Sequence, residues 1–309
     1  MILTVTLNAA IDKVYRLNKM LSGEVNRVVS VTPSAGGKGL NVSRVARLLG
    51  AEILATGMIG GRNGQRILDL MKEEGLKSDF LEVPIESRIC LNIIDDAGAS
   101  TELLEPGDSV DEEIVEAFIT HFKALAEAAK VITLSGSGLK GMPKDIYARL
   151  VEVAQEAGKP VILDSSGEWL SEGLQAMPTL IKPNRDEMIQ LAGSDLDDQA
   201  LIDFCRSYIQ AGIRYVVVSL GSEGALLVSR EGSFRARPPK LDVVNTVGSG
   251  DAMVAGLSIG LLQGSDPDEM LRRSVAVSAA NTLTEQTGFV ETEEVERLYQ
   301  AILVERIGE

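Results

Sequence analysis

Apolar and polar positions follow two repeating patterns along this chain. Short apolar runs predict buried strands, and stretches with apolar residues three or four positions apart predict helices. The runs lie at Ile2–Leu7, Ile53–Met58, Val131–Leu134, Val161–Leu163, Leu180–Ile181 and Tyr215–Ser219. The helical stretches are Lys38–Leu49, Gln65–Glu74, Val110–Ala129, Lys144–Ala157, Arg185–Leu191, Asp198–Ala211, Ala252–Leu262, Asp268–Leu283 and Glu293–Val304. Because helices separate the strands, we expect an α/β fold with a central, mostly parallel sheet covered on both faces.

Two regions interrupt this alternation of strand and helix. Val25–Val31 alternates between apolar and polar residues, and Arg88–Ile94 and Ser100–Leu104 flank a turn at residues 95–98. These segments predict a small, mostly antiparallel sheet, drawn from about residues 14–32 and 87–105. Such a sheet could be a lid over a site, a dimer surface, or both. We therefore expect one α/β domain over residues 1–309, with the small sheet inserted into it.

Composition narrows the range of functions. The formal net charge of −15 argues against nucleic acid or an anionic membrane as a partner. Two cysteines, Cys90 and Cys205, cannot form a disulfide framework and suit a reducing compartment. The single histidine, His121, leaves little room for histidine chemistry. With no basic leader and no apolar run long enough to span a bilayer, we expect a cytoplasmic protein.

The segment Asn245–Asp251 is the strongest candidate for chemistry. Gly248 and Gly250 allow a tight turn, so that backbone N–H groups converge where an apolar helix begins. The unpaired N–H groups and the dipole of that helix suit a phosphate or a phosphoryl group in transfer. Asp251 would face this charge unfavourably unless it acts as a general base. The alternative is that Asp251 only caps the helix.

A second glycine cluster covers Ala35–Asn41. Its glycines allow a ligand to approach the backbone closely, and Lys38 offers a point charge for a phosphate. The alternative is a glycine-rich turn with a solvated lysine. The cluster is not a Walker A loop, because Gly39 stands where that motif needs Ser or Thr.

A third cluster, Gly136–Gly141, matches the G-x-G-x-x-G pattern of dinucleotide-binding folds. It follows a strand, and Asp164 ends the next strand, roughly where an acid would bind ribose. A nicotinamide-dependent dehydrogenase is therefore one hypothesis. Against it, Met142 and Pro143 place the helix start after the third glycine.

Four further places carry polar residues of interest. Asn184 and Glu187 fit a helical capping box, or could orient hydrated Mg²⁺ beside nucleotide phosphates. The glycine turn Ser219–Ala225 follows a strand end, where open α/β sheets bind ligands, although a plain hairpin turn would look the same. Asp12 could bind sugar hydroxyls or be a turn residue, and Arg88 could bind a phosphate or lie on the surface.

Taken together and in order, these motifs give a family resemblance. The chain resembles the PfkB group of ribokinase-like carbohydrate kinases, in the branch of 1-phosphofructokinase and tagatose-6-phosphate kinase. The resemblance rests on the blocks at residues 36–42 and 247–252, with support from residues 134–137 and 182–187. It implies an ATP- and Mg²⁺-dependent kinase that phosphorylates fructose 1-phosphate or tagatose 6-phosphate to the bisphosphate. The implied fold is ribokinase-like, with the inserted sheet as a lid that packs against a second subunit in a homodimer.

The resemblance also assigns roles to individual residues. Asp251 would be the catalytic base and Gly248, Ser249 and Gly250 the anion hole. The sugar would contact Asp12, Gly37, Asn41 and Ser137, with Lys38 and Arg88 on its existing phosphate. The nucleotide would contact Asn184, Ser219, Gly221, Gly224 and Asn281, and Glu187 would act on Mg²⁺ through water.

The chain departs from the family pattern at two places. Ala9 replaces a proline, and we expect little effect because Asp12 stays in place. Gly138-Leu139 replaces Leu-Pro, which changes the stiffness of the loop beside the expected sugar site and affects the substrate prediction. Fructose 6-phosphate therefore stays an alternative acceptor. From other functional classes, the dehydrogenase and a sugar-phosphate sensor that binds without catalysis remain as rivals. Retention of Asp251 in an anion hole argues against the sensor.

Overall fold

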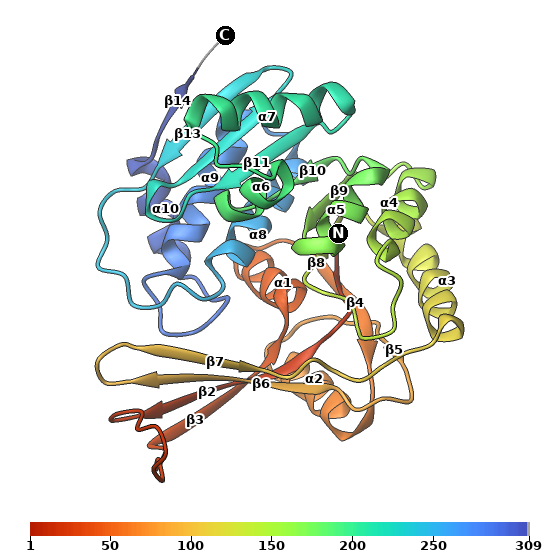
Figure 1. Cartoon of the computed structure of the whole chain (residues 1–309), viewed down its shortest axis with the longest axis vertical. Helices are drawn as coiled ribbons and strands as arrows, with labels where there is room; N and C mark the ends of the chain where they lie inside the picture. Colours follow the sequence, from red (N-terminus) through yellow and green to blue (C-terminus); the bar gives the residue numbers. More distant parts are fainter. Residues whose placement is uncertain (308–309) are drawn as a thin grey trace.

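A ten-stranded sheet runs through the centre of the protein in a computed structural model that describes residues 1–307 (Figure 1). Its order is β14-β13-β12-β11-β10-β9-β8-β1-β4-β5. The parallel strands are β1 (Ile2–Thr6), β4 (Ile53–Ile59), β5 (Leu81–Glu82), β8 (Val131–Ser135), β9 (Val161–Asp164), β10 (Leu180–Ile181) and β11 (Tyr215–Ser219). At one edge, β12 (Ala225–Ser229), β13 (Gly232–Arg237) and β14 (Leu303–Arg306) are antiparallel. The predicted α/β fold with a mostly parallel sheet is confirmed.

Helices cover both faces of this sheet and divide the core into two layers. They are α1 (Lys38–Leu48), α2 (Gly61–Glu73), α3 (Glu112–Ala128), α4 (Ile146–Glu156), α5 (Gly167–Gly173), α6 (Arg185–Ala192), α7 (Asp198–Ala211), α8 (Ser249–Gln263), α9 (Pro267–Asn281) and α10 (Thr292–Ala301). Ile2 of β1 packs in the layer with α1, α8 and α9, whereas Leu3 and Val5 pack with α3 and α4. Most of α8 is buried because its residues are apolar on all sides.

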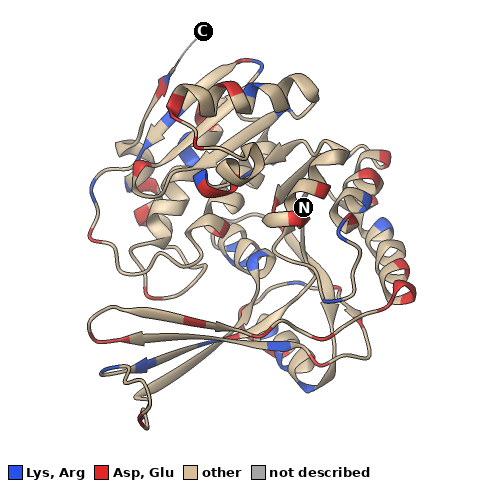
Figure 2. Ribbon diagram, in the orientation of Figure 1, with Lys and Arg blue, Asp and Glu red and all other residues tan. Residues whose placement is uncertain are grey.

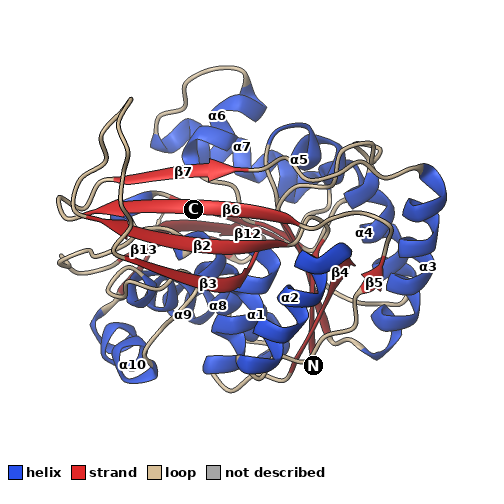
Figure 3. Cartoon of the chain, turned by 90° about the horizontal axis from the view of Figure 1, so that it is seen from below, coloured by secondary structure: helices blue, strands red, loops and turns tan. Residues whose placement is uncertain are grey.

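The small sheet is separate from the main one, as predicted. It has the order β3-β2-β6-β7, with β2 (Ala10–Leu17), β3 (Ser30–Gly36), β6 (Arg88–Asp95) and β7 (Ser100–Leu104). The sheet lies at the lower end of the molecule in Figure 1, and Figure 3, seen from below, shows its four strands side by side. The central pair β2–β6 is parallel and the outer pairs are antiparallel. We call this sheet the lid.

Two local predictions were wrong, and one strand of the small sheet was not predicted. The lid strand expected at Val25–Val31 begins only at Ser30, because the ladder with β2 forms from there to Gly36. The helix expected at Glu293–Val304 ends at Ala301, since the following residues pair with β13 as an edge strand. Strand β2 was not predicted, because its buried and half-buried residues do not alternate in polarity.

The surface helices carry acidic residues (Figure 2), as the net negative charge of the sequence leads us to expect. Figure 2 shows acidic residues on the outward helices α3 and α7. Within residues 1–307, no helix has both the length and the apolar content needed to cross a membrane. His121 lies on α3 and contacts the Asp79 backbone carbonyl and carboxylate, so it has a structural setting on the surface.

Candidate active site

The N-terminus of α8 forms the expected turn of backbone N–H groups. Gly248 caps the helix with φ +83°, a conformation that a side chain would strain. A Cβ at this position would lie 2.8 Å from the Gly288 nitrogen. The first N–H groups of a helix have no partner in its own ladder, so those of Gly250 and Asp251 remain available to an anion.

Asp251 lies in the first turn of α8 and is only 6% exposed. Its Oδ2 accepts a hydrogen bond of 2.8 Å from Asn41 Nδ2 of α1. Burial raises the pKa of Asp251 to about 6, against the opposing effects of Lys38 and of the Asn41 hydrogen bond. A carboxylate with this pKa is ionised at neutral pH and is still basic enough to take a proton.

Two cavities flank this turn. One, of about 480 Å³, lies between the lid and the body, and its walls include Asp12, Asn41 and Val247. The other, of about 600 Å³, is lined by Thr246, Ser249 and Gly250. Its remaining walls come from β11, the 219–224 turn, the segment 238–243 and helices α8 and α9. The residues 246–250 therefore separate two ligand-sized spaces.

Asp164 lies behind the turn, between two lysines. It is 2% exposed, and its oxygens are 3.2 Å from Lys182 Nζ and 3.6 Å from Lys38 Nζ. Burial alone would raise the pKa of Asp164, but the two lysines outweigh it and hold the pKa below its usual range. A Cβ on Gly250 would lie 3.6 Å from Lys182 Nζ, so this ammonium group adjoins the anion-binding turn.

Sequence reasoning gave Asp164 and Lys182 no role at this turn. Asp164 ends β9 and Lys182 directly follows β10, and these strands are neighbours in the sheet. A polar residue at the carboxyl end of each of two adjacent parallel strands is the signal that could have found them. The charged partners of Lys38 lie away from the lid. The Asp164 carboxylate raises the pKa of Lys38, and the negative charges of Asp251 and Glu187 also raise it.

On the lid side, Asp12 is held close to the glycine cluster. A Cβ on Gly36 would lie 2.0 Å from the Asp12 Cγ, and burial raises the pKa of Asp12. Gly37 has φ +106° and packs against Thr6. The Arg88 guanidinium donates to the backbone carbonyls of Asn8 and Glu105, at 3.2 and 2.9 Å.

The predicted nucleotide residues lie on the cavity wall and in the layer behind it, except Asn184, an exposed N-cap residue that pairs with Ser219 and lines neither cavity. Ser219, Gly221 and Gly224 line the larger cavity. Gly224 has φ +84°, and a Cβ there would meet the Ala236 carbonyl at 1.9 Å. Asn281 is fully buried and donates to the Val247 carbonyl at 3.1 Å, which places it behind the anion-binding turn. Ser137 is exposed in the loop after β8.

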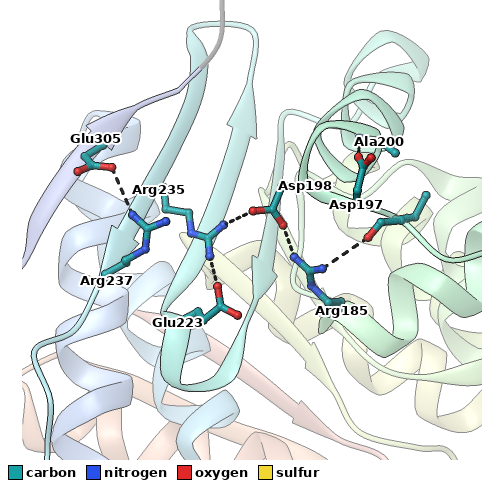
Figure 4. A network of polar contacts seen from close by, with 9 residues as sticks. Arg185, Asp197, Asp198, Ala200, Glu223, Arg235, Arg237 and Glu305 are labelled. Carbon is teal, nitrogen blue, oxygen red and sulfur yellow. Dashed lines mark hydrogen bonds and ion pairs between the residues drawn. The ribbon is translucent and has the colours of Figure 1, made fainter.

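A polar network anchors the 219–224 turn from outside (Figure 4). Glu223 pairs with the buried Arg235 of β13 at 2.7 Å, and Arg235 reaches Asp198 at 3.2 Å. Asp198 also pairs with Arg185, the first residue of α6. The network therefore connects the turn to the starts of α6 and α7.

Comparison with known proteins agrees with this geometry. A family model described as pfkB family carbohydrate kinase matches residues 4–294. The chain belongs to the PfkB family. Its members are carbohydrate kinases, so this chain is a sugar kinase of that family.

Solved structures support the assignment over the full length of this PfkB kinase. Phosphofructokinase-2 from Escherichia coli in complex with fructose-6-phosphate has 27% identity and a TM-score of 0.91, covering 97% of this chain and 98% of that one. A possible 1-phosphofructokinase from Thermotoga maritima has 26% identity and a TM-score of 0.90, covering 100% of both chains. A candidate phosphofructokinase from Staphylococcus aureus has 31% identity and a TM-score of 0.86, covering 99% of both.

The dinucleotide reading of Gly136–Gly141 fails in this PfkB kinase. Helix α4 begins only at Ile146, so the glycines do not open a helix. The Gly136 carbonyl accepts hydrogen bonds from the Tyr147 and Ser165 hydroxyls, at 2.9 and 2.7 Å, which fixes the loop internally. Gly138 is needed because the Trp169 ring lies 2.8 Å from where its Cβ would be.

Magnesium would have to depend on few protein ligands. Among residues 1–307, no three His, Cys, Asp or Glu side chains cluster as a metal site. Asn184 and Glu187 form a capping box, in which Glu187 Oε2 accepts from the Asn184 N–H at 2.8 Å. Glu187 Oε1 carries no such bond among the described contacts. One carboxylate beside a nucleotide cavity fits Mg²⁺ that is held mainly by phosphates and water.

Proposed function

We propose that this PfkB kinase uses ATP and Mg²⁺ to phosphorylate a ketohexose monophosphate at its free primary hydroxyl. The acceptor would be fructose 1-phosphate or tagatose 6-phosphate. The observation that carries the proposal is the position of Asp251, buried in the helix turn that separates the two cavities. A donor in one cavity and an acceptor in the other would meet at this turn.

In this mechanism, Asp251 takes the proton from the acceptor hydroxyl. The hydroxyl oxygen forms a bond to the γ-phosphorus as the bond from that phosphorus to the bridging oxygen of ATP breaks, and ADP leaves. The unpaired N–H groups of Gly250 and Asp251 would stabilise the charge of the phosphoryl group in transfer, in the turn that Gly248 and Ser249 shape, with the Ser249 N–H donating to the Thr246 carbonyl. Bound with the nucleotide, Mg²⁺ would neutralise phosphate charge, with Glu187 orienting its water ligands.

The positive charges of two lysines support the same phosphoryl-transfer mechanism. Lys182 adjoins Gly250, and Lys38 shares the carboxylate of Asp164 with it. Their position favours contact with the transferred phosphoryl group. The family resemblance implied that Lys38 contacts the acceptor's own phosphate. In this proposal Lys38 contacts the transferred phosphoryl group instead, and Arg88 remains to bind the acceptor's own phosphate.

The cavity walls support the assignment of donor and acceptor. Asp12 and Asn41 line the smaller cavity, and with Gly37 and Ser137 they would hold the sugar hydroxyls. The larger cavity has apolar walls at Leu241, Met253 and Val275, which suit an adenine ring. Ser219, Gly221 and Gly224 would contact the nucleotide there, together with Asn184, while Asn281 would support the turn.

The choice of acceptor rests on the relatives. The Thermotoga maritima neighbour is named a possible 1-phosphofructokinase, and the Escherichia coli enzyme was solved with fructose-6-phosphate. Fructose 6-phosphate is therefore the alternative acceptor, and tagatose 6-phosphate differs from it at one stereocentre. A sensor that binds a sugar phosphate without turnover is the alternative from another class.

A homodimer through the lid is part of the proposal. Val25, Val29, Val31, Leu103 and Leu104 are exposed large apolar residues on or beside the lid. Apolar groups concentrated on a separate sheet favour contact with another protein surface. Escherichia coli phosphofructokinase-2 has been solved in a tetrameric inhibited form, so a relative of this fold does assemble.

The direct test is acceptor-dependent ADP formation with Mg-ATP. The panel contains fructose 1-phosphate, tagatose 6-phosphate, fructose 6-phosphate, free fructose and ribose. Turnover on one phosphorylated ketohexose, and little on the free sugars, is the expected result. Folded protein that binds a sugar phosphate and forms no ADP would instead favour the sensor.

A further inference from the structure

The side chain that contacts Asp251 is itself held in one orientation. Asn41 Nδ2 donates to Asp251, and Asn41 Oδ1 accepts from Arg44 Nη1 at 2.9 Å. Arg44 lies three residues further along α1, so both side chains share one face of the helix. A guanidinium group has donors only, so it accepts no bond from the amide nitrogen. Arg44 therefore fixes which end of the Asn41 amide faces the base.

Arg44 is anchored on every side. Its Nε and Nη2 donate to the two oxygens of Glu74, at 2.8 and 3.2 Å, next to the end of α2. Nη2 also donates to the Ala35 carbonyl of β3 at 2.6 Å, and Nη1 to the Thr287 carbonyl at 3.4 Å. With Asn41, these bonds engage all five N–H donors of the guanidinium group. The side chain is 10% exposed, so its position is tightly set.

We propose that Arg44, held by Glu74, is a positioning residue that orients Asn41 so that its amide hydrogen-bonds the catalytic base Asp251. The proposal rests on the proposed function of Asp251 and adds two residues to which no role has been given. It explains why a nearly buried guanidinium group lies in the wall of the acceptor cavity, one helical turn from Asn41. Glu74 balances its charge, so that Arg44 acts on the base through Asn41.

The effect on the base has a definite sign. The groups that face Asp251 are the cations Lys38 and Lys182, the carboxylate Asp164 and the Asn41 amide. A donated hydrogen bond favours the ionised carboxylate, so loss of a well-oriented Asn41 raises the pKa of Asp251 above about 6. The base must be ionised to accept a proton, so the acid limb of the kcat/KM profile moves to higher pH.

The test compares Arg44→Met with a matched control, Arg47→Met. Arg47 lies three residues further along α1 and its Nε donates to the Gly75 carbonyl at 2.9 Å. Both arginines therefore connect α1 to the end of α2 and line the acceptor cavity, but of the two only Arg44 hydrogen-bonds Asn41. A milder variant, Glu74→Gln, weakens the anchor of Arg44 and keeps its size, so it replaces Arg44→Met if that protein does not fold.

We expect the acid limb of Arg44→Met to move up by about one pH unit, which is the effect of losing one hydrogen bond to a charged group. At pH 6 the activity then falls about fivefold further than at pH 8.5. Glu74→Gln moves the limb in the same direction by less. The acid limb of the kcat/KM profile of Arg47→Met should lie at the same pH as that of the wild type, even if the thermal stability of this variant falls.

An Arg44→Met limb that coincides with the wild type, or a loss of activity equal at all pH values, would overturn the proposal. A second readout separates this result from failure of the proposed function. NMR titration of carboxyl-labelled aspartate, with the Asp251 signal assigned from Asp251→Asn, reports the pKa of Asp251 without any turnover. An inactive wild type would refute the kinase mechanism, while the titration still decides whether Arg44 controls this carboxylate.

Discussion

Asp164→Asn is the substitution whose cost follows most directly from the structure. The change removes one negative charge and keeps the shape of the side chain. Asp164 is 2% exposed and pairs with Lys182, which is 5% exposed, and with Lys38. Without the carboxylate, the ammonium group of Lys182 stays buried and uncompensated.

Removing one partner of a buried ion pair costs about 3–5 kcal/mol. Unfolding entropy is about 2.1 cal/mol/K per residue, which over 309 residues gives roughly 5–8 °C of lost melting temperature. The lysines hold the pKa of Asp164 below its unfolded value. Its contribution is therefore complete above that unfolded value and is lost as pH falls through the folded pKa.

The assay is urea unfolding at neutral pH, with Asp198→Asn as the control. Asp198 also lies between two cations, Arg185 and Arg235, but its side chain is 62% exposed (Figure 4). Water reaches the Asp198 carboxylate, and the buried Arg235 keeps its pair with Glu223, so the control is expected to lose about 1 kcal/mol or less. The two variants therefore separate the effect of burial from the effect of charge.

A double-mutant cycle tests whether Asp164 and Lys182 form a buried ion pair. Lys182→Met removes the buried cation, so Asp164→Asn should cost much less in that background. If the losses in unfolding free energy of Asp164→Asn and Lys182→Met simply added up in the double variant, the two residues would not form a buried pair. Equal costs for Asp164→Asn and the Asp198→Asn control would refute the role of burial.

Three further predictions concern the site and the lid. The kcat/KM for the acceptor should fall about tenfold per pH unit below about 6, since Asp251 must lose its proton to act, and a flat profile down to pH 5 would contradict this. Gly248→Ala should lower kcat by about 10²-fold or more because its Cβ meets Gly288, whereas Gly264→Ala, at φ +66° with open space, should keep kcat. Leu103→Glu with Val31→Glu on the lid should turn a dimer into a monomer in sedimentation, and an unchanged dimer would place the interface elsewhere.

The elements found from the sequence are those with strong local patterns. Helix α7 has exactly the predicted bounds, because Asp197 caps it and Gly212 ends it. The antiparallel strands β12 and β13 were missed, although the turn before them was noted. Strand β14 was missed because its pairing with β13 joins segments far apart in the sequence. Such long-range pairing leaves little local trace.

The site residues divide in the same way, into those with a local sequence pattern and those whose partners come from distant parts of the chain. The glycine turn at Gly248 could be predicted, because a tight turn before an apolar helix is a local pattern. The partners of Lys38 could not, since Asp164 reaches it from another part of the chain. Likewise, Arg44 looks like an ordinary helical arginine until α2 and the loop at Thr287 are placed around it.

The role of Asp251 is tested by acceptor-dependent ADP formation of Asp251→Asn, measured beside the wild type. Asparagine keeps the size of the side chain and cannot take the proton, so kcat should fall by about 10²–10⁴-fold. ATP binding and the melting temperature should change little, since the 6%-exposed carboxylate contacts the acceptor side through Asn41. A folded Asp251→Asn protein with kcat within tenfold of the wild type would contradict the assignment of Asp251 as the base.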